Sequence, residues 1–375
     1  MSKKRLGIFL ICALLGLSAV SFFYVIHRNP TSLIQSSPST LHTTYASLAP
    51  TVSTTTPTPT VAIIPYSGKI YHIFFHSLVL YPNLAFKNDA KGKIYKAYMI
   101  TQREFKKILD SLYTHNFVLV DITSLYGKDA EGKVFAKKLS LPKGKKPLII
   151  SLDDLNYYSF MKGRGFADKL VLDHDTTITT EVVTPEGKVT ITHDGDVVPI
   201  LDDFVRKHPD FSPFGVKGVI ALTGFEGVLG YRTQDPTAPG YADDFREAKK
   251  VIARLKQTGW RFASHSYSHD HAFQRGTVSL AAVKDDTQRW RAQVGSLVGD
   301  TDIFIGPFGQ IFKPHDERSK YLVSQGFTML CAVGMDDYLQ YFPDHVAMDR
   351  ADIDGYRIAH SSKALEPYFE SSMVE

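Results

Sequence analysis

Residues 147–152 form an almost entirely apolar run that ends directly at Asp153 and Asp154. A run that is apolar at nearly every position predicts a strand buried on both faces, as in a parallel sheet covered by helices. Other short strand-like segments alternate with helix-like segments along the chain, including a helix over 102–113 that follows the capping residue Thr101. This alternation indicates an α/β fold with parallel strands.

The other predicted strands cover residues 70–75, 117–120, 219–222, 261–264, 302–305 and 328–332, and the other predicted helices cover 242–258, 280–297 and 315–325. Polar residues suited to catalysis follow several of these strands, as they do in β/α barrels, so we expect a barrel in preference to an open sheet. One stretch breaks the alternation, because Thr alternates with Val or Ile over 177–184 and 189–193. We therefore expect an inserted β-hairpin within about residues 166–197, near the rim of the barrel.

The N-terminus differs from the rest of the chain. Lys3, Lys4 and Arg5 precede an uncharged, mostly apolar run over residues 6–26. About 20 such residues span the hydrocarbon layer of a membrane, and the run exceeds the roughly 7–15 residues of a signal-peptide core. It ends in bulky residues, so residues 1–27 are predicted to be an uncleaved single-pass anchor in the cell membrane, with the remainder extracellular. A cleaved signal peptide, which would leave a secreted protein, is the alternative.

Residues 28–65 are rich in Ser, Thr and Pro, and this composition predicts a disordered spacer. The folded domain is then expected over residues 66–375. A net charge of +4 over 375 residues gives no reason to expect a nucleic-acid partner. Cys12 lies in the apolar N-terminal run and Cys331 in the folded domain, so no internal disulfide is expected.

Several segments that follow predicted strands carry residues suited to catalysis: the pair Asp153-Asp154, the pair His265 and His269, the segment Gly306-Pro307-Phe308-Gly309, and His360. Each alone has an ordinary structural explanation. A carboxylate after a strand often caps a helix, a Gly-Pro segment is often a turn, and the chain has 14 histidines among which a spacing of four can arise by chance. Taken together and in this order, the segments predict a single site.

The order of these segments resembles the motifs of the polysaccharide deacetylase (NodB-homology) family, a carbohydrate esterase family with a distorted β/α barrel. Ser151-Leu152-Asp153-Asp154 looks like the family's Thr-Phe-Asp-Asp motif, and His265-Ser266-Tyr267-Ser268-His269 is similar to its His-Ser/Thr-x-x-x-His motif or the version one residue shorter. Ile305-Gly306-Pro307-Phe308 partly matches Arg-x-Pro-Phe/Tyr, and Ile358-Ala359-His360 looks like Leu-x-His. The resemblance covers roughly residues 70–362.

The resemblance implies a metal site and an N-deacetylase activity. Asp154, His265 and His269 would bind a divalent metal, and the type of these ligands favours Zn²⁺. Such a site leaves an open position for water, whose pKa the metal lowers towards neutrality. The implied reaction is the hydrolytic deacetylation of N-acetylated sugars in a cell-wall or exported polysaccharide.

The resemblance also implies roles for residues that do not bind the metal. Asp153 would be the catalytic base, His360 would be the general acid that protonates the departing amine, and the backbone N–H of Phe308 would help to hold the oxyanion.

The chain departs from the family's pattern at specific positions. Ile305 replaces the Arg that would orient the base, and Leu155 replaces a Gly that often follows the aspartate pair. The nearest candidates for the fourth motif, an acidic residue with a Trp, are Asp336 and Asp337.

Without the Arg, either another residue pairs with the base or the activity is low. An alternative function is therefore a membrane-anchored glycan-binding module with weak or no turnover. A related metal amidohydrolase with another N-acyl or ester substrate is a second alternative.

Overall fold

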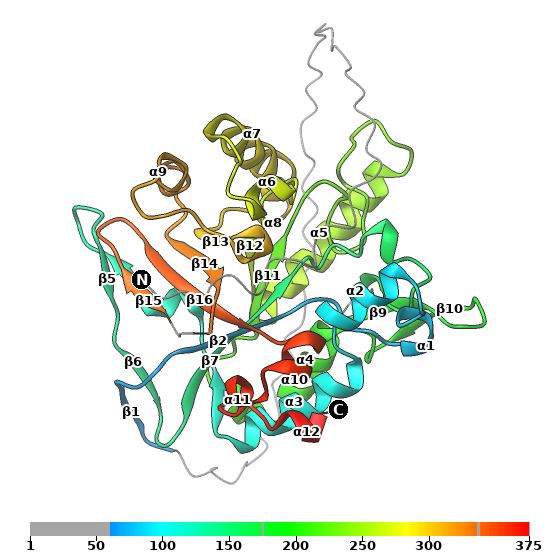
Figure 1. The fold of residues 1–375 in the computed structure, drawn as a ribbon, viewed down its shortest axis with the longest axis horizontal. Helices are drawn as coiled ribbons and strands as arrows, with labels where there is room; N and C mark the ends of the chain where they lie inside the picture. The colour runs from blue at the N-terminus through cyan, green and yellow to red at the C-terminus, as the bar shows by residue number, and fades with distance from the viewer. Residues whose placement is uncertain (1–60, 175, 336–337, 375) are drawn as a thin grey trace, which may run out of the picture. The chain divides into compact units, whose positions relative to one another are not determined.

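The computed structural model describes residues 61–374 apart from 175, 336 and 337 (Figure 1). The predicted anchor over 1–27 and the predicted spacer up to residue 60 lie outside the described residues. No helix within the described part of the chain is long and apolar enough to cross a membrane. Regular structure begins slightly before the expected boundary at residue 66, because β1 (Ile63–Tyr66) pairs antiparallel with β6 (Leu139–Pro142).

Within the described residues, seven parallel strands close into a barrel. Around the ring their order is β11, β12, β13, β14, β16, β2 and β7, and β7 pairs again with β11. Their bounds are β2 (Tyr71–Phe75), β7 (Lys146–Asp153), β11 (Gly218–Leu222), β12 (Trp260–Ser264), β13 (Ile303–Ile305), β14 (Met329–Val333) and β16 (Val346–Asp352). The ring is distorted between β12 and β13, which pair through Ser264 and Phe304. The predicted distorted (β/α) barrel is confirmed.

Shorter strands extend this sheet and lie beside it. β3 (Phe117–Leu119) pairs with the first residues of β7, and β15 (Leu339–Tyr341) pairs antiparallel with β16. β4 (Tyr126–Lys128) and β5 (Val134–Ala136) form a separate antiparallel pair.

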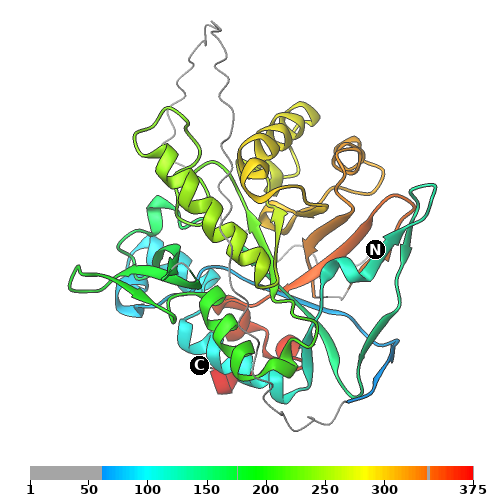
Figure 2. The ribbon, with the colours of Figure 1, turned by 180° about the vertical axis from the view of Figure 1, so that it is seen from behind.

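Helices surround the barrel (Figures 1 and 2). The longer helices are α2 (Ala90–Tyr98), α3 (Gln102–Thr114), α4 (Val197–Lys207), α5 (Tyr241–Gln257), α7 (Leu280–Trp290) and α9 (Glu317–Ser324). The shorter ones are α1 (Pro82–Ala85), α6 (His271–Gln274), α8 (Ser296–Val298), α10 (Gly355–His360), α11 (Ser362–Leu365) and α12 (Ser371–Val374). Thr101 starts α3 as predicted, and it forms a capping box with Glu104.

The barrel strands divide their side chains between two apolar clusters. Along β7, Leu148 and Ile150 join the cluster that packs against α3 and α5, whereas Ile149 joins a second cluster with alternate residues of the other barrel strands. Successive strand residues point to opposite faces, so this second cluster fills the barrel interior. By the same alternation Ser151 and Asp153 point inward at the carboxyl end of β7, where the interior becomes polar.

The insertion is an antiparallel sheet in the order β10-β9-β8. The predicted hairpin is confirmed as β9 (Thr177–Val183) and β10 (Val189–Thr192), with Val183 opposite Val189. A strand that the sequence did not predict, β8 (Ala167–Asp173), completes the sheet on the other side of β9. The sheet packs against α4 and α5, which anchors the insertion to the outside of the barrel.

Candidate active site

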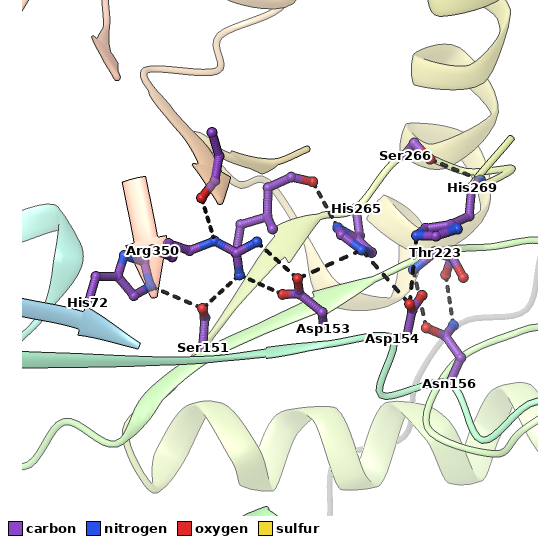
Figure 3. Close-up of polar contacts among 12 residues, drawn as sticks. His72, Ser151, Asp153, Asp154, Asn156, Thr223, His265, Ser266, His269 and Arg350 are labelled. Atoms are coloured by element: carbon purple, nitrogen blue, oxygen red, sulfur yellow. Dashed lines mark hydrogen bonds and ion pairs between the residues drawn. The ribbon is translucent and has the colours of Figure 1, made fainter. Parts of the chain in front are cut away.

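Residues that follow β7 and β12 meet at the carboxyl ends of the barrel strands. Asp154 comes directly after β7, and His265 directly after β12. Together with His269 they form a cluster in which one potential ligand atom of each residue lies within 4.8 Å of the others (Figure 3). Oδ2 of Asp154 is 3.7 Å from Nε2 of His269 and 4.0 Å from Nε2 of His265. The structure thus brings together the residues predicted as metal ligands.

Left-handed backbone conformations turn these side chains into the site. Asp154, Ser266 and His269 have φ angles of 58°, 60° and 48°. Such conformations are uncommon for residues other than glycine, and they persist where the surrounding contacts impose them. Ser266 supplies one such contact, because its Oγ accepts a hydrogen bond of 3.0 Å from the N–H of His269.

The carboxylate of Asp286, on α7, holds the rest of the histidine loop. It accepts hydrogen bonds from the backbone N–H of Tyr267 (2.6 Å), from the backbone N–H of Ser268 (2.9 Å) and from the hydroxyl of Ser268 (2.6 Å). Asp286 is buried. Because it binds the backbone between the two histidines, it limits how far they can move apart.

The orientation of His265 follows from its contact with Ile305. Nδ1 of His265 lies 2.8 Å from the carbonyl oxygen of Ile305. A carbonyl oxygen only accepts, so Nδ1 carries a hydrogen, and Nε2 is the ring nitrogen that faces the aspartates. Burial lowers the pKa of His269 to about 4, so this ring is neutral at physiological pH and its free nitrogen is also available as a ligand.

Asp153 is paired with Arg350, a residue that the sequence did not predict to take part. Arg350 lies on β16, and its Nη1 and Nη2 donate to the two carboxylate oxygens of Asp153 over 2.7 and 2.9 Å (Figure 3). Both side chains are buried. Burial alone would raise the pKa of Asp153, but the charge and the hydrogen bonds of Arg350 outweigh it and lower the pKa to about 2. Arg350 therefore supplies the positive charge beside the base that the family's Arg would supply at the position of Ile305.

Two more buried groups support Arg350 inside the barrel. Its Nη1 also donates to Oγ of Ser151 over 3.0 Å, and its guanidinium lies 4.2 Å from the ring centre of Phe74. Oγ of Ser151 is in turn 3.0 Å from Nε2 of His72. Burial, together with the charge of Arg350, lowers the pKa of His72 well below its ordinary value, so the ring is neutral and adds no positive charge beside Arg350.

His76 is a second site residue that the sequence analysis missed. It follows β2, which lies between β16 and β7 in the ring. Phe75 of β2 is paired with Leu152 of β7, so His76 follows its strand at the same level of the barrel as Asp153. The sequence pattern that could have identified His76 is a histidine directly after an apolar strand, which is also the pattern around His265.

His360 is not brought into this cluster. The sequence places it after a short apolar pair, but Asp354 caps a helix here and His360 is the last residue of α10. Its ring is exposed, stacks on Tyr356 of the same helix, and has Nδ1 2.9 Å from the carbonyl oxygen of Tyr356. The structure thus gives His360 contacts within its own helix.

Phe308 does reach the site. It lies in a 3-10 turn over Pro307–Gly309 with a φ of 55°, and its ring centre is 4.1 Å from that of His269. Asp336 and Asp337, the nearest candidates for the fourth motif, lie outside the described residues.

Comparison with known proteins gives matches among solved structures. No family model matches the sequence, and no curated protein matches it. The chain is similar to the deacetylase PplD from Streptococcus pyogenes, solved in complex with acetate, at 12% identity over 77% of this chain and 93% of that chain, with a TM-score of 0.40. It is also similar to IcaB from Ammonifex degensii, at 14% identity over 81% of this chain and 98% of that chain, with a TM-score of 0.44. In its barrel and its two most specific motifs, the chain resembles the polysaccharide deacetylase (NodB-homology) family.

Proposed function

We propose that this protein is a metal-dependent hydrolase that removes acetyl groups from N-acetylated sugars in a polysaccharide. One observation carries the proposal. The cluster of Asp154, His265 and His269 lies beside the buried, ionised carboxylate of Asp153, at the carboxyl ends of the barrel strands. Active sites of β/α barrels are found at that end.

The donor atoms of the cluster fit a divalent ion, with Zn²⁺ as the proposed metal. Two imidazoles and one carboxylate are a ligand set of catalytic zinc sites. With bonds of about 2.0–2.2 Å, the ligand atoms around a tetrahedral zinc ion lie about 3.3–3.6 Å apart. The separations of 3.7 and 4.0 Å from Asp154 to the two histidines need only small side-chain shifts to reach that range. The neutral state of His269 is the one that binds metal.

The proposed mechanism assigns proton transfer to residues beside the metal cluster. A bound Zn²⁺ supplies Lewis-acid activation of water and of the acyl carbonyl. Asp153 accepts a proton from the attacking water, and Arg350 keeps its carboxylate ionised and oriented for this step. Phe308 remains the proposed oxyanion donor through its backbone N–H.

His76 takes the place of His360 as the proposed general acid. His76 directly follows β2, at the level of the aspartates that end β7, whereas His360 has its contacts within α10. A general acid must stand within reach of the group that it protonates. We therefore assign protonation of the departing amine to His76.

The proposed substrate and location come from the sequence. We propose a cell-wall or exported polysaccharide as the substrate, and a catalytic domain held outside the cell membrane by residues 1–27. The alternative of an inactive glycan-binding module depended on Ile305 leaving the base without a charged partner. The bidentate contact between Arg350 and Asp153 removes that reason and favours turnover.

Metal content and acetate release together test the proposal. We expect about one zinc ion per wild-type chain and none in a variant that combines His265→Ala and His269→Ala. Acetate release from N-acetylglucosamine oligomers should disappear in the same variant. His360→Ala is the matched control and should keep both properties. A wild-type protein that binds no metal even after zinc is added would refute the hydrolytic mechanism, and release of acyl groups only from other N-acyl or ester compounds would assign the site to a related amidohydrolase.

A further inference from the structure

An exposed aromatic surface adjoins the candidate active site. It consists of Tyr158, Phe160 and Phe225, which we call the aromatic stack. The ring of Tyr158 stacks on Phe160, with centroids 5.4 Å apart and planes at 19°, and on Phe225, at 5.0 Å and 15°. Tyr158 is only 6% exposed, but Phe160 is 40% exposed and Phe225 is 37% exposed. The proposed hydrolysis gives no role to the exposed phenylalanines.

The aromatic stack is joined directly to the metal cluster. The hydroxyl of Tyr158 donates to Oδ1 of Asp154 over 2.5 Å and lies 2.7 Å from Oγ1 of Thr223. Phe160 follows in the loop after β7, and Phe225 lies in the loop after β11, so both loops leave the carboxyl ends of neighbouring barrel strands. The exposed rings of the aromatic stack therefore lie at the same end of the barrel as the metal cluster.

Polar contacts fix these two loops to each other. The carboxylate of Glu226, next to Phe225, accepts hydrogen bonds from the backbone N–H (2.7 Å) and hydroxyl (3.1 Å) of Ser159, next to Phe160. Arg232 donates to the carbonyl oxygens of Glu226 (2.6 Å) and Tyr157 (2.7 Å). The two loops that carry the phenylalanines are therefore fixed to each other before a ligand binds. Binding then costs little conformational entropy for ordering these loops.

We propose that the aromatic stack is a sugar-binding subsite, which holds a pyranose ring of the polysaccharide next to the unit that loses its acetyl group. The C–H groups on the faces of a pyranose ring pack against aromatic faces, while its hydroxyls need polar neighbours. Ser159, Glu226 and Arg232 provide such neighbours at the stack. The position of the bound ring relative to the reacting unit rests on the proposed function, but sugar binding itself does not.

Affinity electrophoresis in gels that contain glycol chitin, a soluble N-acetylated polysaccharide, tests the subsite without turnover. A variant with Phe160→Ala and Phe225→Ala should bind about tenfold more weakly than wild type, because it loses both exposed rings. Phe160→Tyr with Phe225→Tyr keeps the rings and should bind nearly as well as wild type. Phe214→Ala is the control for a lost exposed ring, because Phe214 is 48% exposed and precedes β11, away from its carboxyl end.

Equal retardation of the wild type and the double alanine variant, or no retardation of the wild type, would overturn the subsite. Acetate release distinguishes this outcome from failure of the proposed function. The double alanine variant should raise KM for N-acetylglucosamine oligomers while its turnover of the small ester 4-nitrophenyl acetate stays near that of wild type. If no acylated compound is hydrolysed by wild type but retardation still depends on the two rings, the proposed function fails and the subsite stands.

Discussion

Replacing Arg350 with methionine removes the charged partner of Asp153 while keeping a side chain that can fill much of the same space. Arg350 is 0% exposed and Asp153 is 3% exposed, so the carboxylate left behind stays out of contact with bulk water. Removing one member of a buried ion pair typically costs about 3–5 kcal/mol. We expect Arg350→Met to lower the free energy of unfolding by about this amount at pH 7.

The stability difference between wild type and Arg350→Met should depend on pH. In the wild type the pKa of Asp153 is lowered from 3.8 to about 2, so the pair contributes stability above pH 4 that is lost as the pH falls towards 2. In Arg350→Met the carboxyl remains buried, and burial raises its pKa above the unfolded value. Stability is then lost as the pH rises through that higher pKa. The difference between the two proteins should therefore grow from pH 4 to pH 7.

Urea unfolding at pH 4 and pH 7 measures this difference, with a chelator present so that metal binding does not contribute. The matched control is Arg246→Met, because Arg246 forms an exposed ion pair of 2.7 Å with Asp243 and such pairs contribute at most about 1 kcal/mol. Adding Asp153→Asn to Arg350→Met should recover part of the loss, since no unpaired charge remains. A loss below about 1 kcal/mol at pH 7, or the same loss at both pH values, would refute the reasoning.

Three further predictions concern other buried or catalytic groups. His76→Gln should lower the rate of acetate release by about 10²–10⁴-fold without changing the metal content, whereas His360→Gln should leave the rate unchanged; the opposite pattern would return the general-acid role to His360. Asp286→Ala removes the carboxylate that holds the histidine loop, so a competition assay with a chelator should find zinc affinity reduced about 10–100-fold, and an unchanged affinity would contradict this positioning role. Burial raises the pKa of Asp196 to about 6, so its stabilising contribution is present below pH 4 and is lost as the pH rises through 6. Asp196→Asn should therefore be more stable than wild type at pH 8, by at most about 3 kcal/mol, with the difference closing below pH 4 in urea unfolding; equal stability at pH 8 would show that this carboxyl is not destabilised by burial.

Much of the barrel could be predicted from local patterns, and the metal cluster from the resemblance of two motifs to those of a known family. The apolar run before Asp153 identified β7, and the histidine pair after residue 264 identified the end of β12. Parallel strands place their carboxyl ends at the same end of a barrel, so these side chains were expected to meet. The sequence analysis did not predict that the segment ending at His360 is helical. The family motif covers only residues 358–360 and does not include Asp354, which caps the helix.

The sequence by itself determined the alternation of strands and helices and the inserted hairpin, because these depend on residues close together in the chain. The resemblance of its motifs to those of the deacetylase family implied the candidate ligands Asp154, His265 and His269. Only the tertiary structure decided which charge pairs with Asp153 and which further histidine joins the site. Arg350 is separated from Asp153 by 197 positions, and β2, which carries His76 at its end, lies between the strands of both. The order of strands around a closed barrel sets these neighbours. That order depends on how all the apolar surfaces of the strands and helices pack together, so it cannot be predicted from any local sequence pattern.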